Sequence, residues 1–118
     1  MAASQAARLA ELRLESRNQL SVTTVRAIGL ITFATSVSLE HTLRGLIPKF
    51  NRIVLDVSKV DYIDSSGLGV LASVYMQARK TNCHLEIANP KPRLRDVLRS
   101  WLDSVFEGHE ELLGMTPD

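Results

Sequence analysis

Residues 53–69 read IVLDVSKVDYIDSSGLG, and this stretch decides the fold class. It begins with IVLDV, a short apolar run that is typical of a strand covered on both faces. A loop containing Asp61, Tyr62 and Ile63 is expected next, and it leads into DSSG. An amphipathic pattern starts at Ser66. The stretch therefore predicts a buried strand that passes through a loop into a helix.

The sequence after this stretch continues the alternation of helices and strands. Residues 66–80 predict a helix whose apolar side is formed by Leu68, Leu71, Ala72, Tyr75 and Ala78. HLEIA at residues 84–88 predicts a strand, and Asn89-Pro90 marks its exit turn. A last helix is expected from about Pro92 through Trp101, with a buried stripe of Leu94, Val97, Leu98, Trp101 and Leu102.

The sequence before residue 53 predicts strands followed by a helix. ELRLE at residues 11–15 alternates polar and apolar residues, as a half-buried edge strand does. QLSVTTVRAIGLITF at residues 19–33 contains Gly29 and predicts one or two strands broken by a turn or bulge. The helix that follows has Ser36 or Ser38 as its expected cap and Pro48 as its stop. One face of this helix is formed by Leu39, Leu43, Leu46, Ile47 and Phe50.

The order of these elements places the chain in the α/β class. Strands that alternate with helices imply parallel crossovers, while the early strands can pair antiparallel at one side. We expect a mixed sheet with amphipathic helices packed against it. In such sheets function concentrates at the carboxyl ends of strands, where loops lead into helices. This points to the DSSGLG junction, residues 64–69.

The composition is that of a globular protein. The chain has 118 residues and a net charge of +1, with 45% hydrophobic and 23% charged residues. We expect a single domain over residues 1–118, with a core of about residues 10–107 and frayed ends. Fourteen basic residues against thirteen acidic ones leave no charge excess for nucleic acid. There is no long apolar run and no signal peptide, so a cytoplasmic protein without a membrane span is expected.

Catalysis and metal binding find little support in the sequence. Ser65 lacks the Gly-x-Ser-x-Gly frame of a serine hydrolase, and His41, His84 and His109 are each expected at the surface. The lone Cys83 excludes an internal disulfide, and its neighbour His84 would point to the opposite face of a strand. We therefore expect no catalytic residues, no metal and no cofactor.

Two weaker signals leave alternatives open. Gly67-Leu-Gly69 is too short for a Walker loop or a dinucleotide fingerprint, although weak nucleotide binding at the helix terminus stays open. The last helix carries a basic face, which is either solvated or meets an acidic partner. This face consists of Lys91, Arg93, Arg95 and Arg99.

The DSSGLG junction has two interpretations. In the first, Asp64, Ser65 and Ser66 cap the helix, and the glycines allow close packing. In the second, Ser65 is phosphorylated at a positive helix terminus, which adds close to two negative charges beside Asp64. A dianion that must be desolvated at a protein interface is costly, so phosphorylation would act as a release switch.

Residues 53–98 resemble the core of a STAS domain, the module shared by bacterial anti-sigma factor antagonists and the cytoplasmic tails of sulfate transporters. The quoted run continues from DSSGLG through VLASVYMQARKTNCHLEIANPKPRLRDVL, and the resemblance extends to about Phe106. Gly29 and the following LITFA sit, more loosely, where the family has a Gly-x-Leu-Asp strand end. The resemblance implies the STAS fold, with a mixed sheet of four or five strands, and no enzymatic chemistry.

The resemblance also implies partners and site residues. In the antagonist branch, a serine kinase that is also the anti-sigma factor phosphorylates the first serine after the aspartate, which here is Ser65. The unphosphorylated antagonist binds this kinase and frees the sigma factor, and a phosphatase of the PP2C type resets the switch. The kinase-facing surface of the family corresponds to Asp64, Ser66, Gly67, Leu68 and Gly69.

Two further residues are expected near this surface. Thr32 stands where many antagonists carry an acidic residue near the phosphorylated serine, which leaves the strength of the switch open. Val70 lies near the polar side of the helix and is expected to contribute to a partner contact.

The alternative function is a constitutive accessory or scaffold subunit, of the stressosome type or associated with a lipid ABC transporter. In that case DSSG is only a cap and a contact surface. The short length favours a stand-alone antagonist. A homodimer through an exposed edge of the early strands stays open.

Overall fold

The computed structural model describes residues 12–105, which form a four-stranded mixed sheet with three helices packed against it. The strands are β1 (Leu12–Gln19), β2 (Val22–Ile31), β3 (Arg52–Ile63) and β4 (His84–Ala88). The helices are α2 (Ser36–Leu46), α3 (Ser65–Lys80) and α4 (Pro92–Val105). The strand order is β1-β2-β3-β4, with β1 antiparallel to β2 and the other pairs parallel. The predicted α/β class and mixed sheet are confirmed.

The first two strands form a hairpin. The strand predicted from the alternation at residues 11–15 continues to Gln19, although its last four residues are all polar and exposed, and the chain turns at Leu20, which has a φ of 57°. The segment predicted as one or two broken strands contains the end of β1, this turn and all of β2. The expected irregularity lies at Gly29, because its φ of 122° is unfavourable for other residues and the register against β3 shifts beside it.

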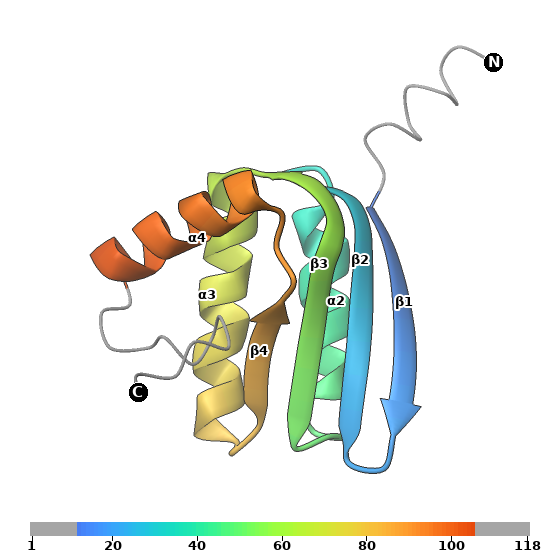
Figure 1. Ribbon diagram of the computed structural model, residues 1–118. Coiled ribbons are helices and arrows are strands. Elements are labelled where there is room, and N and C mark those ends of the chain that lie inside the picture. The colour runs from blue at the N-terminus through green and yellow to red at the C-terminus, as the bar shows by residue number, and fades with distance from the viewer. Residues whose placement is uncertain (1–11, 106–118) are drawn as a thin grey trace, which may run out of the picture.

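The two crossover helices cover one face of the sheet. Figure 1 shows α2 and α3 behind the strands, and the two helices also contact each other. The core between these layers contains Leu39 and Leu43 from α2, Leu71 and Val74 from α3, and the inward side chains of the strands. The predicted face of α3 is slightly rotated, because Val74 is buried whereas Leu68 and Ala72 are only half-buried.

Strand β3 is longer than the sequence predicted. Asp61, Tyr62 and Ile63 belong to the strand and not to a loop, since they extend the parallel pairing with β2 to Ile31. The register shifts twice along this pair, and each shift accommodates one extra residue of β3. As a result the buried positions Val57, Val60 and Ile63 are spaced by three residues, which hides the two-residue period of a strand.

Two predictions were wrong, one about the N-cap of α2 and one about the buried stripe of α4. Ser36 lies inside the first turn of α2 and is buried, and the N-cap is Thr35, whose Oγ1 accepts a hydrogen bond from the Thr32 N–H (2.9 Å). The cap at Ser36 or Ser38 was therefore wrong, as was Val97 in the buried stripe. Val97 is 40% exposed, because the buried stripe of α4 follows the spacing of Leu94, Leu98 and Leu102.

Some expectations lie outside the described residues. These are the frayed ends, the ends of the core at about residues 10 and 107, and the position of His109. Within residues 12–105, no helix combines the length and the apolar character needed to cross a membrane.

Candidate functional site

The β2–α2 loop and the β3–α3 junction meet at one end of the sheet. Because β2 and β3 are parallel, their carboxyl ends lie together, with Leu30 beside Tyr62 and Ile31 beside Ile63. The backbone N–H of Asp64 donates to the carbonyl of Ile31 at 3.0 Å. The sheet pairing therefore extends into the DSSGLG junction and fixes it against the neighbouring loop.

Asp64 joins the two loops through its side chain. It is the N-cap of α3, and its Oδ1 accepts a hydrogen bond from the Gly67 N–H at 3.0 Å. Its Oδ2 accepts from the Phe33 N–H, also at 3.0 Å. The N–H of Gly67, followed by those of Phe33 and Ser66, holds the pKa of Asp64 below its ordinary value of 3.8, with desolvation acting in the opposite direction. Asp64 thus stays ionised and ties the junction together.

Ser65 is the first residue of α3 and is exposed. Its hydroxyl makes no hydrogen bond with any other residue of the described range. The next residue, Ser66, is less accessible, because it is half-buried. The first turn of α3 contains no acidic side chain, so the helix terminus remains positive apart from the cap at Asp64. Ser65 therefore presents a free hydroxyl at the surface of the junction.

Gly67 allows the helix to approach the sheet. A Cβ atom at this position would lie 2.6 Å from Ile31 Cγ2, 2.7 Å from Ile63 Cγ1 and 2.9 Å from the Ile31 carbonyl oxygen. Gly69 differs, because a Cβ atom there would meet nothing within 4 Å. The interpretation that both glycines permit close packing holds for Gly67 alone, and Gly69 leaves a small exposed gap on the helix surface.

The other predicted site residues are less exposed than expected. Leu68 and Val70 are half-buried and pack against the core, so Val70 does not belong to the polar side of α3. Thr32 is also half-buried, and its carbonyl accepts hydrogen bonds from the N–H groups of Thr35 (3.0 Å) and Ser36 (2.7 Å). Thr32 therefore shapes the loop whose next residue, Phe33, binds Asp64.

Three exposed apolar residues beside the junction were missed by the sequence reasoning. Phe33 is 79% exposed, Val37 71% and Tyr62 56%. Phe33 follows the last buried stretch of β2, Val37 is in the first turn of α2 and Tyr62 precedes Asp64 by two residues. Large apolar side chains that gather at the surface are typical of protein contacts. We call Thr32, Phe33, Val37, Tyr62, Ser65 and Gly69 the junction surface.

The structure also shows the surroundings of the charged and potentially metal-ligating side chains that the sequence analysis considered. The carboxylate of Asp61 pairs with the ammonium group of Lys91, so one member of the basic face of α4 serves this contact. Cys83 is buried, and this burial raises the pKa of its thiol, whereas the adjacent His84 is exposed. Among residues 12–105, no three His, Cys, Asp or Glu side chains are arranged to hold a metal ion.

Comparisons with known proteins agree with this architecture. A Bordetella bronchiseptica protein, BtrV, is named as an anti-sigma factor antagonist and is 36% identical over 70 residues. These residues make up 58% of this chain and 60% of BtrV, so less than two thirds of that relative is matched.

Two solved structures share the fold. An anti-sigma factor antagonist from Mycobacterium paratuberculosis superposes with a TM-score of 0.69 at 22% identity, covering 88% of this chain and 92% of that one. The Bacillus cell fate determinant SpoIIAA in its phosphorylated form superposes with a TM-score of 0.63 at 17% identity, covering 77% and 83%.

The family assignment rests on a match that spans most of the chain. The family model of the STAS domain matches residues 13–103, which include the junction and the four strands of the sheet apart from Leu12. The resemblance inferred from residues 53–98 is confirmed. The chain belongs to the STAS domain family.

Proposed function

We propose that this chain is an anti-sigma factor antagonist that binds an anti-sigma factor serine kinase through the junction surface and is released by phosphorylation of Ser65. The observation that carries the proposal is the exposed hydroxyl of Ser65 at the start of α3, at the end of the sheet where the exposed side chains of Phe33 and Tyr62 also lie. The name of BtrV and the phosphorylated form of SpoIIAA support it by analogy.

The apolar part of the junction surface provides affinity. Phe33 and Tyr62 are aromatic residues of the type that dominates binding energy at interfaces, and both are largely accessible. Their backbones are fixed, because Phe33 donates its N–H to Asp64 and Tyr62 is paired in β3. Phe33 binds Asp64, which directly precedes Ser65, and Tyr62 lies three residues before Ser65, so we expect a partner that covers these side chains to reach Ser65.

A phosphate on Ser65 would oppose this binding. In the free protein, the positive helix terminus favours the added charge while the Asp64 carboxylate disfavours it, so the two effects partly cancel. In the complex, the dianion would have to lose its water beside aromatic side chains. A penalty of about 2.8 kcal/mol would weaken binding roughly a hundredfold.

In this proposal the chain is a substrate and not an enzyme. The kinase transfers the γ-phosphoryl group of ATP to the Ser65 oxygen, the hydroxyl proton is lost and ADP leaves. A phosphatase of the PP2C type then hydrolyses the ester with water and restores the hydroxyl. Nucleotide binding by the chain itself gains no support from the junction, since the Gly67 N–H is already donated to Asp64.

A phosphorylation assay tests the site. The protein is incubated with ATP and each candidate serine kinase from its genome, and the modified residue is mapped by mass spectrometry. We expect phosphate on Ser65, retained in Ser66→Ala and absent from Ser65→Ala. Modification at Ser66 alone, or at neither serine with any kinase, would reject the assignment.

The constitutive accessory subunit remains the second candidate, because a specific observation fits it. The bonds of Asp64 and the close approach of Gly67 would be needed even if Ser65 were never modified. Genomic neighbours separate the candidates: genes for a kinase and a sigma factor favour the switch, and an ABC-transporter operon favours the accessory subunit.

A further inference from the structure

The outer edge of β1 is unpaired within the described part of the chain. β1 is the first strand in the sheet order, and only its β2 side carries a ladder. It runs for eight residues without a proline. Such an edge presents free N–H and C=O groups to any strand that can lie alongside it.

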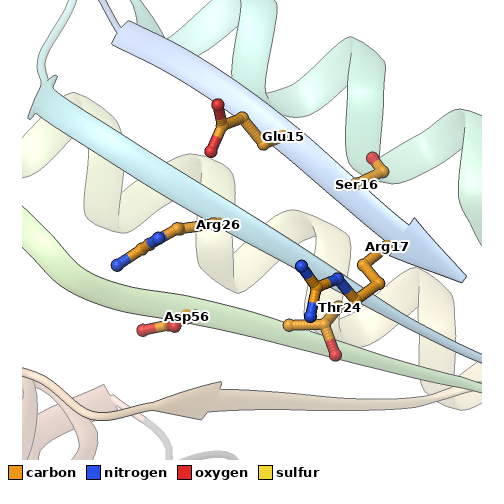
Figure 2. Close-up of a pocket in the computed structure, with 6 residues that line it drawn as sticks. All are labelled: Glu15, Ser16, Arg17, Thr24, Arg26 and Asp56. Atoms are coloured by element: carbon orange, nitrogen blue, oxygen red, sulfur yellow. The ribbon is translucent and has the colours of Figure 1, made fainter.

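The two sides of β1 differ in character. Leu12 and Leu14 are half-buried and pack against the core, so even-numbered residues face the helices and odd-numbered residues face the open side of the sheet. The open side carries Arg13, Glu15 and Arg17, and the guanidinium group of Arg13 lies 3.9 Å from the Glu15 carboxylate. Figure 2 shows Glu15 and Arg17 on β1, with Arg26, Thr24 and Asp56 on the neighbouring strands, around a depression of about 530 Å³.

The charges of this depression do not suit a free anion. Two guanidinium groups, Arg17 and Arg26, share it with two carboxylates, Glu15 and Asp56. Along β1 itself, Glu15 and Arg17 alternate in sign, which suits a strand alongside that carries the same two charges in the opposite order. An antiparallel copy of β1 is such a surface, because its Arg17 and Glu15 run in reverse.

The charges and the length of the pairing together select one register. With Ser16 opposite Ser16 of a second copy, each Glu15 faces the other copy's Arg17 on the same side of the sheet. Centring the pair on Glu15 places glutamates opposite each other and Arg13 opposite Arg17. Centring it on Arg17 places arginines opposite each other. Like charges directly opposite are destabilising, so the registers centred on Glu15 and on Arg17 are unfavourable. A register centred on Leu14 would place Glu15 opposite the other copy's Arg13, but it would pair only residues 12–16 of the described strand, whereas the register centred on Ser16 pairs residues 13–19.

We propose that the chain forms a homodimer in which two β1 strands pair antiparallel about a two-fold axis at Ser16, joining the two sheets into one. Seven residues of each strand, 13–19, then pair with the other copy. Ser16 is small and exposed, so the axis is free of steric conflict. The dimer leaves the junction surface accessible, because α3 starts at the end of β3, two strands away from this edge.

Charge reversal tests the pairing. Sedimentation measured up to about 1 mM protein should show a concentration-dependent dimer for the wild type. Arg17→Glu should weaken the dimer by roughly tenfold or more, as should Glu15→Arg, because each variant places like charges opposite each other. The double variant Glu15→Arg/Arg17→Glu should restore the dimer. Arg13→Glu separates this register from the one centred on Leu14. Arg13 faces the uncharged Gln19 in the proposed register, so this variant should not weaken the dimer, although it removes the exposed contact of Arg13 with Glu15 of the same strand (3.9 Å).

A cross-linking experiment tests the register. Opposed residues of an antiparallel pair have Cα atoms about 4.5–5.5 Å apart, which suits a disulfide. Ser16→Cys should form an intermolecular disulfide on mild oxidation, whereas Asn18→Cys should not. The native Cys83 is the only cysteine of the chain and is buried, so it does not compete.

Each outcome decides the proposal separately from the phospho-switch. A wild type that remains monomeric, a charge-swapped double variant that stays as weak as the single variants, or equal cross-linking at positions 16 and 18 would overturn it. If the natural occupant of the edge is a strand of a different protein, the wild type will remain monomeric. Ser65→Glu should dimerise like the wild type, whether or not it affects kinase binding.

Discussion

Asp64 and Gly67 act together at the start of α3. The carboxylate of Asp64 holds the N–H of Gly67 at 3.0 Å, while the missing side chain of Gly67 lets the helix approach Ile31 and Ile63. These contacts fix where Ser65 emerges from the surface. Two residues of the DSSGLG motif, Asp64 and Gly67, are thus required by the fold itself.

The glycines of α3 provide a matched pair of substitutions. Gly67→Ala should destabilise the protein by about 1–3 kcal/mol, because the new methyl group would overlap Ile31 and Ile63. Gly69→Ala should stabilise it by about 0.5–1 kcal/mol, since the site is open and alanine favours a helix. Urea unfolding measures both. Equal effects would contradict the close approach at Gly67.

Gly69→Ala also tests the junction surface. Gly45 in α2 is equally open, so Gly45→Ala should give a similar gain in stability. If Gly69 faces the partner, its alanine variant should bind the kinase more weakly than the Gly45→Ala variant. Indistinguishable affinities would remove Gly69 from the surface.

The ionisation of Asp64 predicts a pH dependence. Its folded pKa is lowered by the Gly67 N–H, so its stabilising effect is fully present above the unfolded pKa of about 3.9. This effect is lost as the pH falls through the folded pKa. Asp64→Asn cannot accept the Phe33 N–H through its amide nitrogen, and it should lower the melting temperature by roughly 5 °C near neutral pH. The variant should also lose stability less steeply below about pH 4. If the variant and the wild type lose stability equally steeply there, the stabilising role of the ionised Asp64 is refuted.

At the scale of elements, the β2–α2 loop brings apolar side chains to the end of the sheet. The loop is held by hydrogen bonds of Thr35 and Asp64, and Phe33 and Val37 are exposed in this arrangement. Phe33→Ser should therefore reduce affinity for the partner kinase by roughly tenfold with little change in stability.

Leu20 supplies the control for this prediction. It is 96% exposed in the β1–β2 turn, at the opposite end of the sheet from the junction. Leu20→Ser removes a similar exposed apolar side chain, and it should leave binding unchanged. Titration calorimetry with the kinase separates the two variants, and a similar loss in both would argue against a localised surface.

The elements differ in how well the sequence predicts them. The core strand at residues 53–57, the helix that begins beside DSSG and the strand at residues 84–88 follow regular periods, and each was predicted correctly. The second half of β3 was not, because its two extra residues shift the phase of the buried positions. The cap of α2 was assigned to Ser36 or Ser38 instead of Thr35, since the sequence offers several hydroxyl residues within four positions.

At the scale of the whole molecule, the sequence predicted where the DSSGLG junction lies in the fold but not which exposed side chains lie beside it. DSSGLG was correctly expected at the carboxyl end of a strand, where α3 begins. The apolar contribution of Phe33, Val37 and Tyr62 depends on the parallel pairing of β2 with β3, which brings distant segments together. No local pattern reveals that arrangement, and Phe33 reads in the sequence as part of a strand.

The central claim is that phosphorylation of Ser65 releases the partner. The most direct measurement is the affinity of the kinase, identified by the phosphorylation assay, for unphosphorylated protein, for protein phosphorylated on Ser65 and for Ser65→Ala. The account predicts that Ser65→Ala binds like the unphosphorylated protein and that the phosphorylated form binds roughly a hundredfold more weakly. Equal affinities for the phosphorylated and unphosphorylated forms would contradict it.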